Sequence, residues 1–241
     1  MNSSIQIISL TNLSIALIPS VIVIFILFKW SLNYKNTLYA FFRMLVQLML
    51  IGHFLAFIFE SDSSWLILSI LILMILASSW IALGSGKLKK KTFYLKALIS
   101  ISIGGGLTLL LITQGVLNLT PWYFPQYIIP IAGMIFANSM NSISLAAERL
   151  QSELKRNVSF PEARNIAFHA SLIPITNALF AVGLVSLPGM MTGQILSGIS
   201  PFVAARYQIM VMCMIYGSSG ISAACFLSFV RKNFEQREIS S

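Results

Sequence analysis

Polar side chains within long apolar stretches are the residues of this sequence whose types and spacing could do chemistry. Arg43 and Gln47 are four residues apart and would share one face of a helix. An arginine is costly to leave in lipid, so Arg43 either works with a partner inside the membrane or extends its charged end to the membrane surface. Asn138 and Asn141, three residues apart in another apolar stretch, either hydrogen-bond to neighbouring helices or line a pathway.

Several methionines could bind a soft metal ion through their thioether sulfurs. In apolar helices, however, methionine is more often packing material. The methionines concerned are Met190, Met191, Met210, Met212 and Met214. No carboxylate lies inside any predicted membrane span, which argues against a hard-cation site within the bilayer. The metal ligands are therefore left unassigned.

The sequence lacks the motifs of the common nucleotide-binding and hydrolytic sites. Gly84–Lys87 (Gly-Ser-Gly-Lys) has only part of a phosphate-binding loop, because Ile81 stands where the first glycine is needed and Leu88 where serine or threonine is needed. Neither HExxH nor GxSxG occurs. We therefore expect a chain that is not an enzyme and binds no cofactor of its own.

The composition predicts that most of the chain lies in a membrane. Of its 241 residues, 57% are hydrophobic and 10% are charged, whereas soluble domains carry about 25% charged residues. A chain of this length cannot bury so much apolar surface in its own core. The net charge of +9 comes from short basic tracts rather than from a nucleic-acid-binding face. We therefore expect a multi-pass protein of the cell (inner or plasma) membrane that binds no nucleic acid.

Seven stretches are apolar and long enough to cross a bilayer as helices. They are residues 7–28, 38–59, 64–84, 97–117, 122–145, 170–187 and 207–230. We thus predict an all-α, polytopic fold of about seven transmembrane helices. Residues 188–200, rich in proline and glycine, are predicted to form either a broken, re-entrant segment before the last helix or an external loop.

The basic residues predict the orientation of the chain. Fourteen of the sixteen lysines and arginines lie in the tracts 29–37, 85–96, 146–169 and 231–241. Because basic residues gather on the cytoplasmic side of membrane proteins, the N-terminus is expected outside and the C-terminus in the cytoplasm.

The tract 146–169 is the one sizeable cytoplasmic feature of this arrangement. Leu150 and Leu154 repeat at helical spacing among charged residues, which predicts an amphipathic extension of the fifth span. Ser159 and Glu162 have the spacing of a capping box, which predicts a new helix lying crosswise at the membrane surface. Such a helix either receives a partner protein or is an ordinary connector.

Three stretches resemble the FetB family of ABC-type permeases, a group implicated in iron export whose plant relatives act in aluminium tolerance. They are Arg43–Leu48, Pro130–Met134 continuing to Asn138, and Val182–Gly193 running on to Ser200-Pro201 and Tyr207-Gln208. The third stretch is long and specific. Its signature residues are Gly183, Pro188, Gly189, Met190, Met191 and Gly193. The resemblance implies that the segment Pro188–Gly198 shapes the pathway or the dimer contact.

The resemblance implies that residues 1–241 form a single transmembrane permease domain, energised by a separate ATP-binding subunit that holds ATP and Mg²⁺. It also implies an assembly of two permease chains, a homodimer, with two ATPase chains. The tract 146–169 would then be the coupling region, with the helix over 159–169 seated on the ATPase. The coupling residues implied are Ser159, Phe160, Pro161, Glu162, Ala163 and Arg164.

One stretch departs from the pattern of the family. Relatives typically carry Val-Asp-x-x-Lys-Thr-Val-Gly before the signature, whereas here Asn177 replaces the acid and Phe180 replaces the base. Both charges are absent together, so the local balance stays neutral. If that pair handles substrate or protons in relatives, this chain would carry something else. Asn177 joins the candidate pathway or interhelical residues.

The predicted function is that of the permease subunit of an ATP-driven ABC exporter for a metal ion such as iron. Two alternatives stay open at this point. The first is an ABC permease for an organic solute such as a nucleotide sugar, and the second is a channel or secondary transporter that works without ATP.

Overall fold

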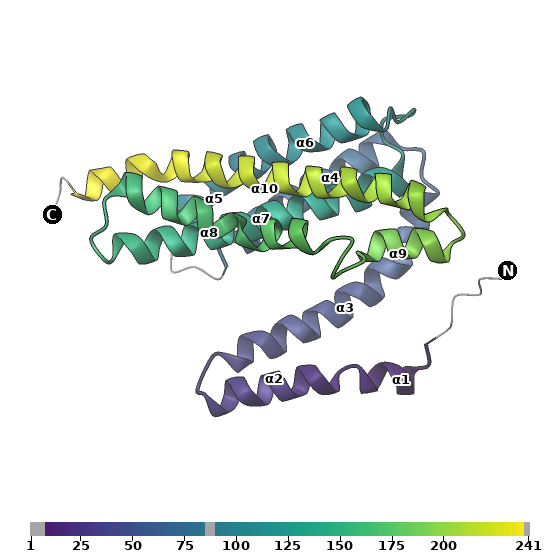
Figure 1. Ribbon diagram of the computed structural model, residues 1–241, viewed down its shortest axis with the longest axis horizontal. Coiled ribbons are helices and arrows are strands. Elements are labelled where there is room, and N and C mark those ends of the chain that lie inside the picture. The colour runs from purple at the N-terminus through teal and green to yellow at the C-terminus, as the bar shows by residue number, and fades with distance from the viewer. Residues whose placement is uncertain (1–7, 85–89, 239–241) are drawn as a thin grey trace. The chain divides into compact units, whose positions relative to one another are not determined.

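The computed structural model describes residues 8–84 and 90–238. Most of the Gly84–Lys87 stretch and the first residue of the predicted span 7–28 fall outside these ranges. Within them the chain is helical apart from turns, loops and one isolated bridge between Val182 and Ser186, which confirms the predicted all-α fold (Figure 1). The chain divides into two compact units, Met1–Ser61 and Asp62–Ser241, each described here by itself.

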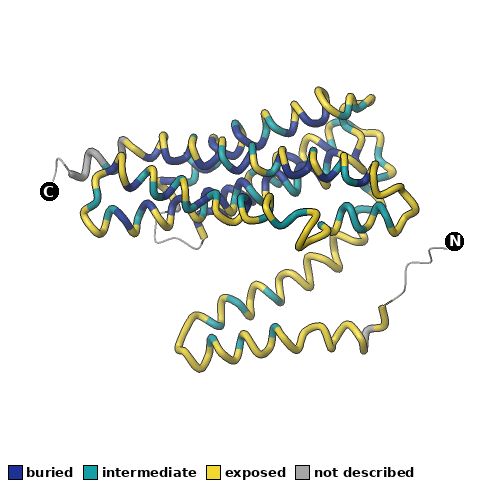
Figure 2. Tube along the Cα trace, viewed as in Figure 1, coloured by how far each residue is buried: buried dark blue, intermediate teal, exposed yellow. Residues whose placement is uncertain are grey.

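The first unit is a helical hairpin. α1 (Leu10–Ile15) and α2 (Ile18–Lys29) are followed by a tight turn and by α3 (Tyr34–Phe59). The rings of Phe28 and Tyr34 meet edge-on across that turn, with centroids 5.3 Å apart. None of the described side chains of α2 and α3 is buried, as the colouring of Figure 2 shows. Apolar helices without a buried face are typical of spans that lipid surrounds.

The second unit is a helical bundle. Its helices are α4 (Ser64–Ala82), α5 (Lys90–Ile101), α7 (Pro125–Leu154), α8 (Phe160–Ala181), α9 (Gly189–Leu196) and α10 (Pro201–Glu238). Between α5 and α7 the chain stays helical through α6 (Leu107–Leu110). This short helix is flanked by two wider π-helical stretches, η1 (Ser102–Gly106) and η2 (Leu111–Val116).

α7 lies at the centre of this bundle and packs against α4, α8 and α10. Its fully buried apolar residues include Ile131, Ile135 and Ile143, which recur at helical spacing along one side. The glycines of η1 permit close packing, since a methyl group on Gly105 would lie 2.9 Å from the ring of Phe136. The core of the second unit is therefore built around one face of α7 (Figure 2).

Six helices of the described chain are long and apolar enough to cross a membrane. They are Thr11–Lys29, Tyr34–Phe59, Ser64–Ala82, Lys91–Val116, Pro125–Leu154 and Pro201–Arg231. They correspond to all the predicted spans except 170–187, and they confirm a polytopic membrane protein. The number of seven spans and the orientation of the termini stay predictions.

The region around the remaining predicted span differs from the expectation. α8 runs without interruption from Phe160 to Ala181, so the separate crosswise helix expected over 159–169 was wrong. No glycine or proline lies between Glu162 and Ile173, so nothing ends the helix there. The helix stops at Ala181, short of the expected residue 187, because Val182 is extended and Gly183 has φ +83°. The predicted extension of the fifth span is present, since α7 continues to Leu154.

Candidate functional site

A cavity of about 310 Å³ lies between α7, α8, α9 and α10 of the second unit. In Figure 1, α9 and the loop between α7 and α8 lie at opposite ends of this unit. α8 contributes Ile175 and Ala178 from its last two turns, and Val182 follows directly after its end. The cavity wall therefore includes the end of α8 that is remote from the α7–α8 loop.

α10 contributes the most buried polar group of the cavity. Gln208, Val211, Met212 and Ile215 line the wall at helical spacing. Gln208 is 5% exposed, and its Oε1 has no hydrogen-bond partner among the described residues. Leaving a buried acceptor without a partner costs about 1–3 kcal/mol. A buried amide oxygen without a partner calls for an explanation such as an ordered water or a bound ion.

α7 contributes a thioether and a second amide. Met134 and Asn138 both line the cavity and are one helical turn apart. Asn138 Nδ2 donates a hydrogen bond to the backbone oxygen of Met134 at 2.8 Å. The amide donor is thus used within α7, and the side-chain oxygen is the acceptor left for a ligand.

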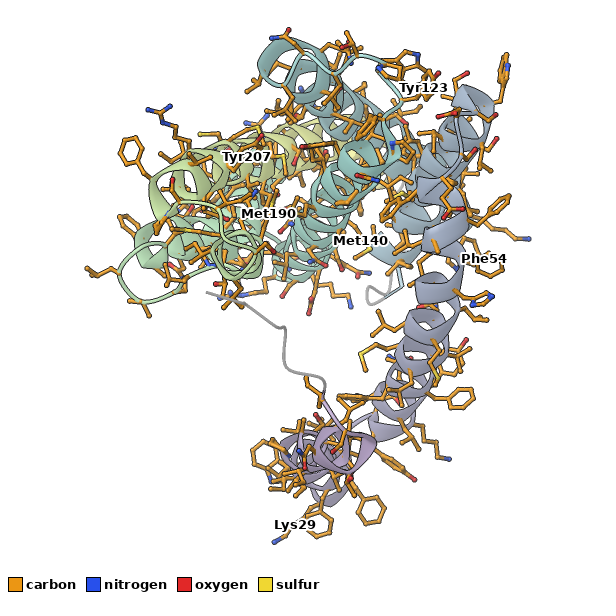
Figure 3. The ribbon with its side chains drawn as sticks, turned by 90° about the vertical axis from the view of Figure 1, so that its right-hand side faces the viewer. Lys29, Phe54, Tyr123, Met140, Met190 and Tyr207 are labelled. Atoms are coloured by element: carbon orange, nitrogen blue, oxygen red, sulfur yellow. The ribbon has the colours of Figure 1, made fainter. Side chains whose placement is uncertain are left out.

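The break between α8 and α9 forms the rest of the wall. The Gly183 N–H donates to the Ser186 oxygen at 3.0 Å, and Gly183 adopts a positive φ that side chains other than glycine rarely take. Pro188 then precedes α9 as its N-cap. This turn brings Ser186, Pro188 and Met190 to the cavity. Figure 3 shows Met190, with Tyr207 of α10, at this end of the unit.

The structure gathers some of the candidate residues and separates others. Of the pathway candidates, Asn138 lines the cavity, whereas Asn141 and Asn177 are exposed elsewhere on α7 and α8. Arg43 and Gln47 are exposed on α3 of the first unit.

The signature segment divides in the same way. Pro188, Gly189 and Met190 line the cavity, whereas Gly183 forms the preceding turn. Met191 and Gly193 belong to α9 but are not among the residues that line the cavity.

Among the cavity residues that carry a polar or sulfur atom, Met134, Ser186 and Gln208 were not predicted as site residues, and Met212 was considered only as a possible soft-metal ligand. Gln208 carried a usable signal, because it is a polar residue within the apolar stretch 207–230. Nothing in the sequence distinguishes Met134 and Met212 from methionines that only fill space.

The α7–α8 loop is anchored by aromatic rings. Phe160, at the start of α8, is 3% exposed. Its ring stacks on Phe234 near the end of α10, with centroids 6.4 Å apart, and Phe234 stacks on Phe93 of α5 at 5.7 Å. Three helices thus meet at this end of the bundle.

A buried carboxylate precedes the same loop. The Glu153 side chain is 3% exposed, and its oxygens lie 2.8 Å from Arg149 and 3.6 Å from Arg156. The closer approach is an ion pair without the alignment of a hydrogen bond. The Val158 and Arg156 N–H groups both donate to the Glu153 backbone oxygen, which fixes the start of the loop.

The implied coupling residues do not form one exposed face. Ser159, Pro161 and Glu162 are exposed, whereas Phe160 and Ala163 are buried. The half-buried Arg164 donates to Asn165 Oδ1 at 3.0 Å and 3.2 Å.

The predicted capping box is incomplete. Ser159 is the N-cap of α8, but its side chain makes no capping hydrogen bond. The surface that a partner could reach at the start of α8 is therefore narrower than the six residues implied.

Long apolar helices, an outer surface rich in large apolar side chains and a partly polar cavity between helices define a multi-pass integral membrane protein. The chain belongs to the uncharacterised protein family UPF0014, and the match to this family covers residues 10–234.

Three relatives show the breadth of this family. A UPF0014 membrane protein of Synechocystis sp. is 35% identical over 81% of this chain and 82% of its own length. The Escherichia coli protein named "Probable iron export permease protein FetB" is 34% identical over 95% of this chain and 94% of its own length. "Protein ALUMINUM SENSITIVE 3" of Arabidopsis thaliana is 30% identical over 90% of this chain and 88% of its own length. No solved structure matches the chain.

Proposed function

We propose that this chain is the permease subunit of an ATP-driven ABC transporter that exports a metal ion such as iron. The observation that carries the proposal is the cavity among α7, α8, α9 and α10, whose lining residues include Gln208 with its unpartnered side-chain oxygen. The Escherichia coli relative named "Probable iron export permease protein FetB" is similar to this chain over 95% of its residues. This similarity supports a metal ion as the cargo.

The cavity is the proposed cargo site. Polar groups inside a membrane-spanning bundle are expensive and mark the routes of solutes. Sites in transporters often lie where a helix is broken, because the ends of the two halves expose backbone groups. The break between α8 and α9 at the cavity has this form.

α8 is the proposed link between the ATPase and the cargo. Its first turn is held by the buried Phe160 and Ala163, and its last turns line the cavity through Ile175 and Ala178. From Ala163 to Ala178 the helix rises about 22 Å. Pro174 lies within this stretch of α8 and cannot donate a backbone hydrogen bond, so a displacement of the α7–α8 loop would reach the cavity wall through a helix that can bend at this point.

The partner in this proposal is an ABC ATP-binding subunit, and two copies of each chain form the transporter. The partner holds ATP and Mg²⁺ and carries out hydrolysis. It would meet the coupling region through the exposed side chains at the start of α8, namely Ser159, Pro161 and Glu162.

Co-purification with a transport assay tests the proposal. The tagged chain is isolated from its native membrane, and its associated proteins are examined for an ATP-binding subunit. Charge reversal by Glu162→Lys should weaken that association and lower ATP-dependent metal accumulation in inside-out vesicles. Glu60→Lys, a reversal at an exposed residue beyond the end of α3, is the matched control and should leave both unchanged. Full transport without any ATP-binding protein would overturn the proposal.

A further inference from the structure

The ligating groups around the cavity belong to two chemical kinds. Met134, Met190 and Met212 bring three thioether sulfurs, and Asn138 and Gln208 bring two amide oxygens. The remaining side chains of the described cavity wall are apolar or small, apart from the hydroxyl of Ser186, and none is ionisable. The donor set is therefore soft and electrically neutral.

The neutral wall disfavours highly charged ions. The cost of moving an ion from water into a medium of low dielectric grows with the square of its charge. Buried charges are tolerated when a counter-charge is beside them, and this cavity wall supplies none. A singly charged cation is thus far less costly here than a divalent or trivalent one.

The sulfurs select by softness. Thioethers prefer soft ions such as Cu(I), whereas Mg²⁺, Ca²⁺ and Mn²⁺ prefer carboxylates, carbonyls and water. Methionine also has three rotatable bonds, so side chains on three different helices can adjust to one small ion. The half-buried Met134 and Met190 and the buried Met212 have this freedom toward the cavity.

We propose that the cavity binds a soft, singly charged metal ion of the Cu(I) class, through the thioethers of Met134, Met190 and Met212 with the Gln208 oxygen as a further ligand. This inference rests on the proposed function, because it takes the cavity as the cargo site of a metal exporter, and it replaces iron as the leading cargo with softer, singly charged ions. The unpartnered Oε1 of Gln208 is the observation independent of the methionines.

The helix ends beside the cavity do not reverse this preference. The C-terminal end of α8 and the N-terminal end of α9 both contribute to the wall. Their dipoles carry partial charges of opposite sign and similar size, about half an elementary charge each. The two ends offset each other, and the side chains decide the selectivity.

Equilibrium binding of Ag(I), a soft singly charged probe, tests the inference on the purified full-length chain in detergent. Because thiols also bind soft metals, the measurement uses a chain with Cys213→Ala and Cys225→Ala. Mn²⁺ and Fe²⁺ are measured alongside under reducing conditions. Ag(I) should bind about one ion per chain, and Mn²⁺ at least about tenfold more weakly.

Conservative substitutions identify the site. Met190→Leu and Met212→Leu keep the packing volume and should each weaken Ag(I) binding by about tenfold, in the range seen when support for a metal is lost. Met49→Leu, at a residue 80% exposed on α3, is the control and should not change it. Circular dichroism and elution volume confirm that each variant is folded.

The inference is overturned if Mn²⁺ or Fe²⁺ binds as tightly as Ag(I), or if the two cavity variants bind Ag(I) like the Met49→Leu control. Neither result tests the coupling of transport to an ATPase, because this measurement involves no ATPase. Failure of the proposed function would instead appear as the absence of an ATP-binding subunit in the co-purified material.

Discussion

The ring of Phe160 in the first turn of α8 stacks on Phe234 near the end of α10, with centroids 6.4 Å apart and planes inclined by 26°. This contact ties the start of α8 to a helix that carries Gln208 into the cavity. The two ends of the bundle are thereby joined by two rods, α8 and α10, which both reach from the α7–α8 loop to the candidate site.

Removing this aromatic anchor should loosen the coupling end. Phe160→Ala deletes a ring that is 3% exposed and should lower the free energy of unfolding by about 3 kcal/mol. Phe160→Leu should cost less, because it fills part of the space. The measurement is denaturant unfolding of the purified chain in detergent. Phe180→Ala, at a residue 80% exposed, is the control, and equal losses in the two alanine variants would contradict the role of the stack.

The approach of η1 to α10 leaves no room for a side chain. A methyl group at Gly104 would lie 2.6 Å from the backbone nitrogen of Ser222 and 3.0 Å from its Cα, so the two helices would have to separate. Gly104→Ala should therefore destabilise the unit by about 1–3 kcal/mol. At Gly106 a methyl group meets nothing within 4 Å, and Gly106→Ala should be neutral or mildly stabilising. Thermal unfolding of the two variants, measured in parallel, tests this difference in stability.

The ion pair before the α7–α8 loop should be asymmetric in its energetics. Glu153 is buried, whereas the side chain of Arg149 is 47% exposed. Arg149→Ala leaves a carboxylate in a poorly solvated position and should be destabilising by about 1 kcal/mol or more. Glu153→Gln removes the charge that needs compensation, so it should cost less.

The double variant Arg149→Ala with Glu153→Gln provides the control for this pair. It should be more stable than Arg149→Ala alone, as measured by unfolding in detergent. Additive losses from the two substitutions would show that the pair is not coupled.

Replacing Gln208 should keep or raise the stability of the empty protein and lower its transport activity. Gln208→Leu removes the unpartnered oxygen and should leave the empty protein as stable as the wild type, or more stable by about 1 kcal/mol. The same change should strongly reduce metal transport, because a ligand of the cargo is lost. Gln126→Leu, at an exposed position in the first turn of α7 away from the cavity, should leave transport intact. A Gln208→Leu chain that transports normally would remove Gln208 from the site.

The sequence was sufficient to predict the membrane helices, because their signal is a run of apolar residues that needs no tertiary information. Six helices of the structure match predicted spans. α8 was misread because the capping-box spacing of Ser159 and Glu162 indicates where a helix begins but not where it ends. The fold sets the end by the turn at Gly183, which spacing alone does not locate to the residue.

The candidate site was only partly predictable for a different reason. Asn138 and Met190 were singled out by residue type, yet what joins them to Gln208 is the packing of α7, α9 and α10. Asn141 is three residues from Asn138 but exposed, and no pattern within one helix distinguishes them. Phe160 was likewise assigned to a contact surface from its place in the sequence. It is buried because its ring stacks on Phe234, which is more than seventy residues further along the chain.

ATP-dependent accumulation of metal in inside-out vesicles tests the central claim most directly. Vesicles containing the chain and its co-purified ATP-binding subunit are offered iron(II) and Ag(I) in separate assays, each with and without ATP. The account predicts that a metal accumulates only with ATP and that Gln208→Leu strongly reduces the accumulation while the Gln126→Leu chain retains it. Accumulation that is equal with and without ATP, or that is unchanged by Gln208→Leu, would contradict it.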